Sequence, residues 1–275
     1  MIERYTKQFD IDGSVTKGEQ ESLGRSPETR LTILAIGDVH GRDVLSRIEA
    51  DKYDKIVFIG DYVDSHYDDT YPDAKILENL RKIIAFKKAY PGKVVLLIGN
   101  HDVHYMYHNE VAECSGFRRS MLAELQEMFT ANSGLFDMAY QCKTTLFTHA
   151  GVSNAWYREY NGAIHAELRK IREQSVIKDP LSLADKFNLL RSTEAGRQIL
   201  FRISGLRIWP QNLLQSGGII WADQEETDFD YLKGYHQVVG HTVVVAIEKK
   251  MDHYDDSSSI TYIDTENREF YEVTI

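Results

Sequence analysis

Five short apolar segments of this chain are each followed by a motif that combines glycine with aspartate, asparagine or histidine. Short apolar runs that end at turn residues are typical of buried strands. In an α/β protein the carboxyl ends of the strands share one edge of the sheet, and ligands bind there. The sequence therefore predicts that these motifs, although far apart in the chain, meet at one edge. They are GDVHG (37–41), GDYVD (60–64), GNHD (99–102), THAG (148–151) and VGHT (239–242).

The polar residues of these motifs form a set of carboxylates, imidazoles and one amide, with no sulfur. Mixed oxygen and nitrogen donors fit Mn, Fe or Zn at five- or six-coordinate positions better than a structural zinc site. Two metal ions need a bridging carboxylate, and Asp61 is the candidate. We expect Asp38 and His40 to complete one metal site and Asn100, His149 and His241 to complete the other, with open positions for water and phosphate.

One glycine followed by aspartate or histidine after a strand is ordinary turn chemistry and indicates little by itself. The ordered set is different. At about one chance in twenty for each specified residue, an accidental match over eleven or more positions, each placed after a strand, is negligible. The full series therefore indicates a site.

Helical periodicity separates the predicted strands. It appears at 44–48, at 77–84 before Pro91-Gly92, and at 121–129, which gives a βαβαβ order and an α/β fold. Residues 154–205 are predicted to be helices that cover the sheet, with a break at Asp179-Pro180.

The two ends of the chain differ in character. Residues 1–30 are polar and predict a loose arm or a peripheral hairpin, whereas 31–275 contain no linker and predict one domain. From Gln237 onward the runs HQVVG, VVVAIEK, SITYID and REFYEV are spaced like antiparallel neighbours, so we expect the tail to form a second sheet.

Composition excludes several classes of protein. The 32 Lys and Arg against 42 Asp and Glu give a net charge of -10, which repels a nucleic acid backbone. Apolar runs such as 94–98 are far shorter than the roughly 20 residues of a membrane-spanning helix. Cys114 and Cys142 form no CxxC pair, which favours a reducing compartment. We therefore expect a cytoplasmic protein with no membrane or nucleic acid partner.

The ordered series GDxHG, GDxVD, GNH, HAG and GH resembles the calcineurin-like metallophosphoesterases. Within them it resembles the phosphoprotein phosphatase branch, which includes serine/threonine phosphatases, bacterial and phage phosphatases and diadenosine tetraphosphatases. The resemblance covers roughly residues 32–275. It implies a four-layer α/β/β/α sandwich with two mixed sheets and two metal ions. It also implies that a hydroxide bridging the ions attacks a phosphate ester in line, with His101 as leaving-group acid and Asp64 orienting it.

Val243 supports the choice of branch. Many other superfamily members carry a GHxH motif whose second histidine binds the first metal, and Val243 stands at that position here. The resemblance therefore leaves the first metal with Asp38, His40 and the bridging Asp61.

Two departures from the branch pattern affect the substrate side. Where the branch has GDxVDRG this chain has GDYVDSH, so Ser65 replaces an arginine that grips phosphate and cannot supply its forked donors. Members of the branch resemble one another in a second arginine upstream of a Trp-Ser/Ala-Asp run. Here Trp221-Ala222-Asp223 fits that run, and the spacing favours Arg207 over Arg202 as this arginine. Arg42, next to GDVHG, is a further candidate. The motif GNHD replaces GNHE and keeps a carboxylate.

The leading hypothesis is a hydrolase that acts on a phosphoprotein or a small phosphomonoester. The alternative is a dinucleoside polyphosphate or nucleotide pyrophosphohydrolase, because the aromatic loops at 62–71 and 104–108 could stack on a base, although packing of the loops explains them equally well. A non-catalytic metal-binding scaffold is disfavoured, since every predicted ligand and the predicted acid are present.

Overall fold

The computed structural model describes residues 30–65, 70–177, 179–207 and 215–275. The arm or hairpin predicted for residues 1–30 lies outside the described residues except for Arg30, so it stays a prediction. The elements below all belong to residues 31–275.

The first sheet carries three of the predicted motif strands. Its order is β10-β1-β2-β3-β4, with β1 to β4 parallel and β10 antiparallel to β1 at one edge. Parallel neighbours send their carboxyl ends to the same edge, which is what the motif argument requires. The strands are β1 (Thr32–Ile36), β2 (Lys55–Phe58), β3 (Val94–Leu97), β4 (Phe136–Asp137) and β10 (Tyr271–Thr274).

The second sheet carries the other two motif strands. Its order is β5-β6-β7-β9-β8, where β6, β7 and β9 are parallel and the edge strands β5 and β8 are antiparallel to their neighbours. In register, Phe147 of β6 lies opposite Val238 of β7. The strands are β5 (Ala139–Cys142), β6 (Thr145–Thr148), β7 (His236–Val239), β8 (Glu248–Asp252) and β9 (Asp255–Tyr262).

The two sheets share a buried apolar layer. Side chains alternate along a strand, so Ile33 and Ala35 of β1 pack against residues such as Phe147 and Val238 of the second sheet. The intervening residues of β1 join the larger apolar cluster on the other face. Both faces of the first sheet are therefore covered, as a mainly parallel sheet requires.

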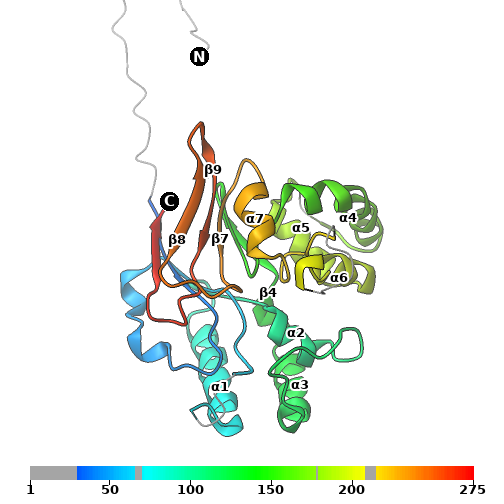
Figure 1. The fold of residues 1–275 in the computed structure, drawn as a ribbon. Helices are drawn as coiled ribbons and strands as arrows, with labels where there is room; N and C mark the ends of the chain where they lie inside the picture. The colour runs from blue at the N-terminus through cyan, green and yellow to red at the C-terminus, as the bar shows by residue number, and fades with distance from the viewer. Residues whose placement is uncertain (1–29, 66–69, 178, 208–214) are drawn as a thin grey trace, which may run out of the picture. The chain divides into compact units, whose positions relative to one another are not determined.

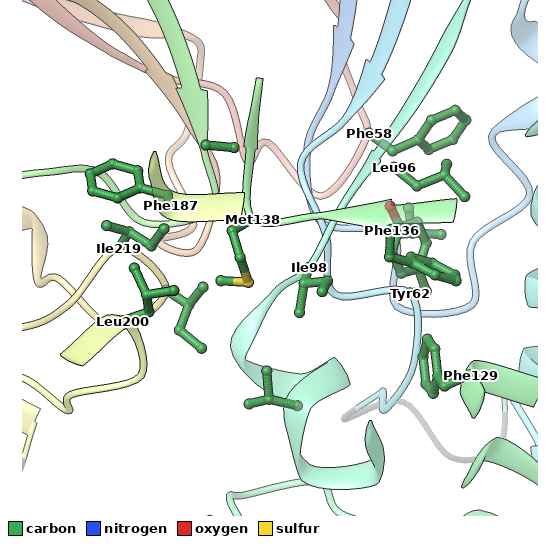
Figure 2. Packing of buried hydrophobic residues seen from close by; sticks show 14 of the residues in the cluster. Phe58, Tyr62, Leu96, Ile98, Phe129, Phe136, Met138, Phe187, Leu200 and Ile219 are labelled. Atoms are coloured by element: carbon green, nitrogen blue, oxygen red, sulfur yellow. The ribbon is translucent and has the colours of Figure 1, made fainter. Parts of the chain in front are cut away.

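Helices form the outer layers (Figure 1). The helix α1 packs beside β3, and α4, α5 and α6 contact one another beside β5 of the second sheet. Figure 2 shows Phe129 of α3 near Phe136 and Tyr62, and Phe187 and Leu200 of the second helical group near Ile219. The helices are α1 (Asp73–Ala89), α2 (Asn100–Met106), α3 (Leu122–Ala131), α4 (Asn154–Gln174), α5 (Leu183–Leu190), α6 (Glu194–Leu200) and α7 (Gln224–Asp230).

This arrangement confirms the predicted α/β fold with two mixed sheets and helices outside them, and each sheet has five strands. The predicted helical cover at 154–205 corresponds to α4, α5 and α6. Within the described residues, no helix combines the length and the apolar character needed to cross a membrane.

Four predictions about single elements were wrong. The run HQVVG forms β7, which is parallel to both of its neighbours and not antiparallel. The helical pattern at 44–48 gives only two 3₁₀ turns, 45–47 and 50–52, and neither has a side-chain cap. The run 243–249 forms a strand only from Glu248, because Val243 and Val245 are exposed in a loop. The last strand, β10, joins the first sheet beside β1 and does not extend the second sheet. Alternating side chains suit an edge strand of either sheet, so the pattern does not choose the partner.

Candidate metal centre

The predicted metal ligands follow the carboxyl ends of five strands and lie together at one edge. Several of them have left-handed backbone conformations, with φ of 46° at His40, 49° at Asp61 and 65° at His241. Asp64, predicted to orient the acid, has φ of 54°. Such a conformation costs a residue other than glycine about 1–2 kcal/mol, and strain of this kind concentrates at functional sites.

Two motif glycines are required because side-chain oxygens of the centre approach them closely, and not because of their backbone φ angles. A Cβ on Gly99 would lie 2.1 Å from Asp61 Oδ1, and a Cβ on Gly240 would lie 2.2 Å from Asp38 Oδ1. The motif glycines at these positions therefore let the loop backbones pack directly against the carboxylates.

The metal-ligand atoms of Asn100, His149 and His241 lie close together. We call these three residues the closed half of the centre. The distances are 2.8 Å from Asn100 Oδ1 to His149 Nε2, 2.8 Å from Asn100 Oδ1 to His241 Nδ1, and 3.1 Å between the two imidazole nitrogens. Asp61 Oδ2 lies 3.4 Å from His149 Nε2. Ligand bonds of about 2.0–2.2 Å at right angles place neighbouring ligand atoms roughly 2.8–3.1 Å apart.

The protonation state of His149 shows that this cluster fits a cation. Its Nδ1 lies 2.9 Å from the carbonyl oxygen of Ile59, which can only accept, so Nδ1 carries the proton. Burial lowers the pKa of His149 to about 3, so the ring is neutral and Nε2 presents a lone pair. That lone pair faces the amide oxygen of Asn100, which also only accepts, and Nε2 lies 3.4 Å from Asp61 Oδ2. A metal ion would satisfy all three atoms.

Asp38 and His40 form what we call the open half, and it is looser. His40 Nδ1 lies 2.9 Å from the carbonyl oxygen of Val63 and 2.6 Å from that of Asp64, which directs Nε2 into the site. From there Nε2 is 4.0 Å from Asp38 Oδ2 and 3.8 Å from Asp61 Oδ2. Burial, followed by the neighbouring His101, lowers the pKa of His40 to about 4, so this ring is also neutral.

The carboxylates of the centre need positive charge. Burial raises the pKa of Asp38, and burial together with the nearby Asp38 raises that of Asp61 well above its ordinary value. Both oxygens of Asp38 also accept the backbone N–H of His241, at 3.0 and 3.1 Å, which ties the open half to the loop of the closed half. The ligand set and its charge therefore fit metal ions, and Asp61 lies near ligand atoms of both halves.

His101 and Asp64 lie beside this centre. His101 Nδ1 is 3.2 Å from Asp64 Oδ2, and the His101 ring meets the His40 ring edge to face at 5.1 Å between centroids. Tyr105 donates its hydroxyl proton to the other oxygen of Asp64, and Cys114 Sγ lies 3.4 Å from His101 Nδ1. Burial raises the pKa of Asp64 to about 7. The motif search missed Tyr105 and Cys114, because neither follows a strand.

Asp102, the last residue of GNHD, has a structural role that the motif did not reveal. Its carboxylate accepts the backbone N–H groups of Asp61 and Tyr62, each at 2.9 Å, and of Gly99 at 2.8 Å. It therefore binds the loop after β2 to the start of α2, and the shorter side chain of aspartate reaches all three donors.

A cavity of about 500 Å³ opens above the centre. Both arginines predicted to bind substrate, Arg42 and Arg207, line it, as does Ser65 at the position of the missing arginine. Arg202 is not among the described residues around this cavity; its side chain bonds Gln215 instead. The full lining is Asp38, His40, Arg42, Asp61, Ser65, Asn100, His101, Ser115, Arg207, Trp221, His241, Val243, Asp264 and Glu266.

Two acidic residues of the lining, Asp264 and Glu266, were missed by the motif search. They follow β9 at the same sheet edge, but no glycine marks the end of that strand. The rule that strand ends carry the site applies to β9 as well and would have found Asp264.

The aromatic side chains of the two flanking loops mostly pack the protein. Tyr62 and Tyr105 have no exposed surface, and Tyr105 and His108 both stack on Phe117. Residues 66–69 lie outside the described part of the chain, so the suggestion of base stacking there stays untested.

Together the fold and this edge define a sandwich of two sheets whose strand ends hold a site for metal-dependent chemistry. The model of the calcineurin-like phosphoesterase family matches residues 31–245. The chain belongs to this family, and it is therefore a phosphoesterase, a hydrolase of phosphoric ester bonds.

Solved structures of phosphatases are also similar to this chain. A cold-active protein-tyrosine phosphatase of a psychrophilic Shewanella species is 19% identical, with a TM-score of 0.47, over 86% of this chain and 71% of that chain. A protein serine/threonine phosphatase from Saccharomyces cerevisiae is 14% identical, with a TM-score of 0.42, over 86% and 68%. A comparison with curated protein sequences finds no match.

Proposed function

We propose that the protein is a metal-dependent phosphohydrolase of the phosphoprotein phosphatase branch, acting on a phosphoprotein or a small phosphomonoester. The single observation that carries the proposal is the closed half, where ligand atoms of Asn100, His149 and His241 lie 2.8–3.1 Å apart and Asp61 lies 3.4 Å from His149, the spacing expected around a metal ion. Asp38, His40 and Asp61 would hold one metal ion, and Asp61, Asn100, His149 and His241 would hold the other.

The chemistry of the proposed reaction divides between the ions and the chain. Bound metal ions would polarise the phosphate group and lower the pKa of a water molecule. The side chain of His101 faces the cavity and donates a proton to the leaving oxygen, while Asp64 holds the imidazole through the 3.2 Å contact at Nδ1. That contact leaves Nε2 as the nitrogen that meets the substrate.

Arg207 supplies the positive charge expected for the outer oxygens of the phosphate. Its Nε lies 3.0 Å from Asp223 Oδ2 and its Nη2 donates to Thr242 Oγ1 at 3.1 Å, so the guanidinium is fixed next to the loop of His241. In this proposal it takes the place of the arginine that Ser65 replaces.

The alternative substrate, a dinucleoside polyphosphate or other nucleotide, gains no support from Tyr62 and Tyr105, two of the described aromatic residues in the loops that suggested it. Tyr62 and Tyr105 are buried and do not line the cavity. We therefore favour a phosphomonoester.

A phosphate-release screen tests the proposal. The protein, stripped of metal and reloaded with Mn, would be offered phosphopeptides, sugar phosphates, nucleotides and dinucleoside polyphosphates. We expect release from at least one phosphomonoester, and its loss on exhaustive chelation. Activity that survives chelation, or no release from any substrate, would contradict the proposal.

A further inference from the structure

Each of the two arginines in the cavity is paired with a carboxylate, but the two carboxylates are placed differently. Arg207 pairs with Asp223, which is not among the described residues that line the cavity. Arg42 Nη2 lies 3.2 Å from Glu266 Oε1, and Glu266 does line the cavity. The partner of Arg42 therefore faces the space where substrate binds, whereas the partner of Arg207 supports it from outside that space.

The loop that carries Glu266 is held in a demanding conformation. Glu266 and Asn267 have φ of 55° and 58°, values that glycine adopts freely and other residues rarely adopt. Hydrogen bonds fix the loop, since Asp264 accepts the Glu266 N–H at 3.0 Å and Asn267 Nδ2 donates to the Asp38 carbonyl at 2.6 Å. A charged side chain thus stands at a strained position beside the predicted metal ligand Asp38.

Arg42 is held by two contacts in this corner. Besides the pair with Glu266, its Nη1 donates to the carbonyl oxygen of Asp38 at 3.4 Å. Its guanidinium is mostly buried, with 14% of the side chain exposed against 33% for Glu266. The carboxylate of Glu266 therefore lies where an anionic substrate group would otherwise meet Arg42.

We propose that Glu266 is a specificity-determining residue, which rests on the phosphohydrolase function proposed above. Its carboxylate occupies the anion position beside Arg42, so the cavity accepts one phosphate group and rejects a substrate with a second, adjacent phosphate. Like charges placed together oppose binding strongly, and selection against a competing ligand commonly uses such a repulsive group. The inference names the substrate class: phosphomonoesters are preferred to polyphosphates.

Selectivity between two substrates tests this role. The measurement is kcat/KM for p-nitrophenyl phosphate and for ATP with the Mn-loaded wild type and Glu266→Gln. We expect the ratio to shift toward ATP by roughly tenfold or more, because a repulsive contact is replaced by a neutral one. Inorganic pyrophosphate should become a tighter competitive inhibitor by a similar factor, with little change for inorganic phosphate.

Three further variants separate selectivity from structure. Glu266→Gly keeps the left-handed φ without strain and should shift the ratio in the same direction, which guards against misfolding of one variant. In the double variant Arg42→Gln with Glu266→Gln the shift of the kcat/KM ratio toward ATP should disappear. In the single variant Arg42 is the group that becomes available to the second phosphate. The matched control Asp223→Asn should affect both substrates alike.

Two different failures can be told apart. If the wild type hydrolyses phosphoesters and both Glu266 variants leave the ratio and the pyrophosphate inhibition unchanged, the specificity role is wrong and the proposed function stands. If the wild type hydrolyses no phosphoester, the proposed function fails and this inference fails with it.

Discussion

The closed and open halves of the predicted metal centre share Asp61 but are built differently. In the closed half the donor atoms of Asn100, His149 and His241 lie 2.8–3.1 Å apart, and the His149 side chain has no exposed surface. In the open half His40 Nε2 is 3.8–4.0 Å from the carboxylates, and 16% of its side chain is exposed.

The difference follows from the number of strands that feed each half. The closed half draws on the ends of β3, β6 and β7, whereas Asp38 and His40 both come from the loop after β1. Fewer protein donors leave open positions, which catalytic metal sites keep for water and substrate. The open half also lies beside the predicted acid, with the His40 and His101 rings 5.1 Å apart. We therefore expect the closed half to bind its metal ion more tightly and the open half to face the substrate.

Removing the shared ligand should have the largest effect. Asp61→Asn takes the bridging charge from both halves, so we expect loss of both ions and a fall in phosphate release of roughly 10⁴-fold, given the several kcal/mol that metal ions contribute. Metal analysis and phosphate release measure it. Asp43→Asn, exposed and close in sequence to the open half, is the control. Two tightly bound ions in Asp61→Asn would show that Asp61 does not bridge.

The predicted acid on the open side gives the next effect. His101→Ala should lower turnover by roughly 10²- to 10⁴-fold for poor leaving groups and much less for p-nitrophenolate, which leaves without a proton. Asp64→Asn should give a smaller loss in the same direction. Metal content should stay at the wild-type value. Equal losses on both kinds of substrate would count against proton donation by His101.

Metal titration compares the two halves directly. The wild type should bind two ions in two steps, the tighter one in the closed half. His149→Ala should weaken the tighter step by roughly 100-fold or more, since even outer partners of metal ligands are worth about 10- to 100-fold. His40→Ala should weaken only the other step. If His40→Ala removes the tighter ion, the assignment of the two halves is reversed.

A substitution of Arg207 tests its proposed role in binding the phosphate. Arg207→Ala should raise KM and lower kcat/KM by about 10- to 100-fold, corresponding to a charged hydrogen bond of about 1.5–3 kcal/mol, without loss of metal. Arg202→Ala, outside the cavity, is the matched control. If Arg207→Ala leaves kcat/KM unchanged while Arg42→Ala lowers it strongly, the phosphate binds on the Arg42 side of the cavity.

The smallest effect is on the stability of the metal-free protein. Burial raises the pKa of Asp64 and Asp102 to about 7 and that of Asp264 to about 8, against 3.8 when unfolded. The folded state then binds more protons, so this stability is present at low pH and is lost as the pH rises through 7 to 8. The pKa values of His40, His104, His149 and His241 are lowered by burial, so these residues act in the opposite direction, mainly below pH 7.

Between pH 6.5 and 8.5 the carboxylates dominate, because the unfolded histidines lose most of their protons in the lower part of this range. We expect the Tm of the chelated protein to fall over this range by a few degrees, since about 1 kcal/mol shifts Tm by roughly 2–4 °C in a domain of this size. Calorimetry with and without Mn measures it, and added Mn should reduce the fall. Asp264→Asn should also reduce it. A Tm that rises with pH over this range would contradict the pKa directions.

The sequence predicted much of the fold and the candidate site from local chemistry. Apolar runs ended by glycine located β1, β2, β3 and β7, the run before His149 located β6, and the residues after these strands are the ones that meet at the sheet edge. It did not place β10 beside β1, because an alternating strand suits the edge of either sheet. It missed Asp264 and Glu266 because the residues after β9 contain no glycine-bearing motif like those after the other site strands.

What the sequence determined by itself is the set of chemical groups and their position at strand ends, since both depend on short-range pattern. Tertiary structure decided the rest. The unequal spacing of the two halves, the bonds from the backbone N–H groups of Asp61 and Tyr62 to Asp102, and the meeting of Arg42 with Glu266 all join residues far apart in the chain. Such contacts arise from the packing of loops from both sheets, which no local pattern encodes.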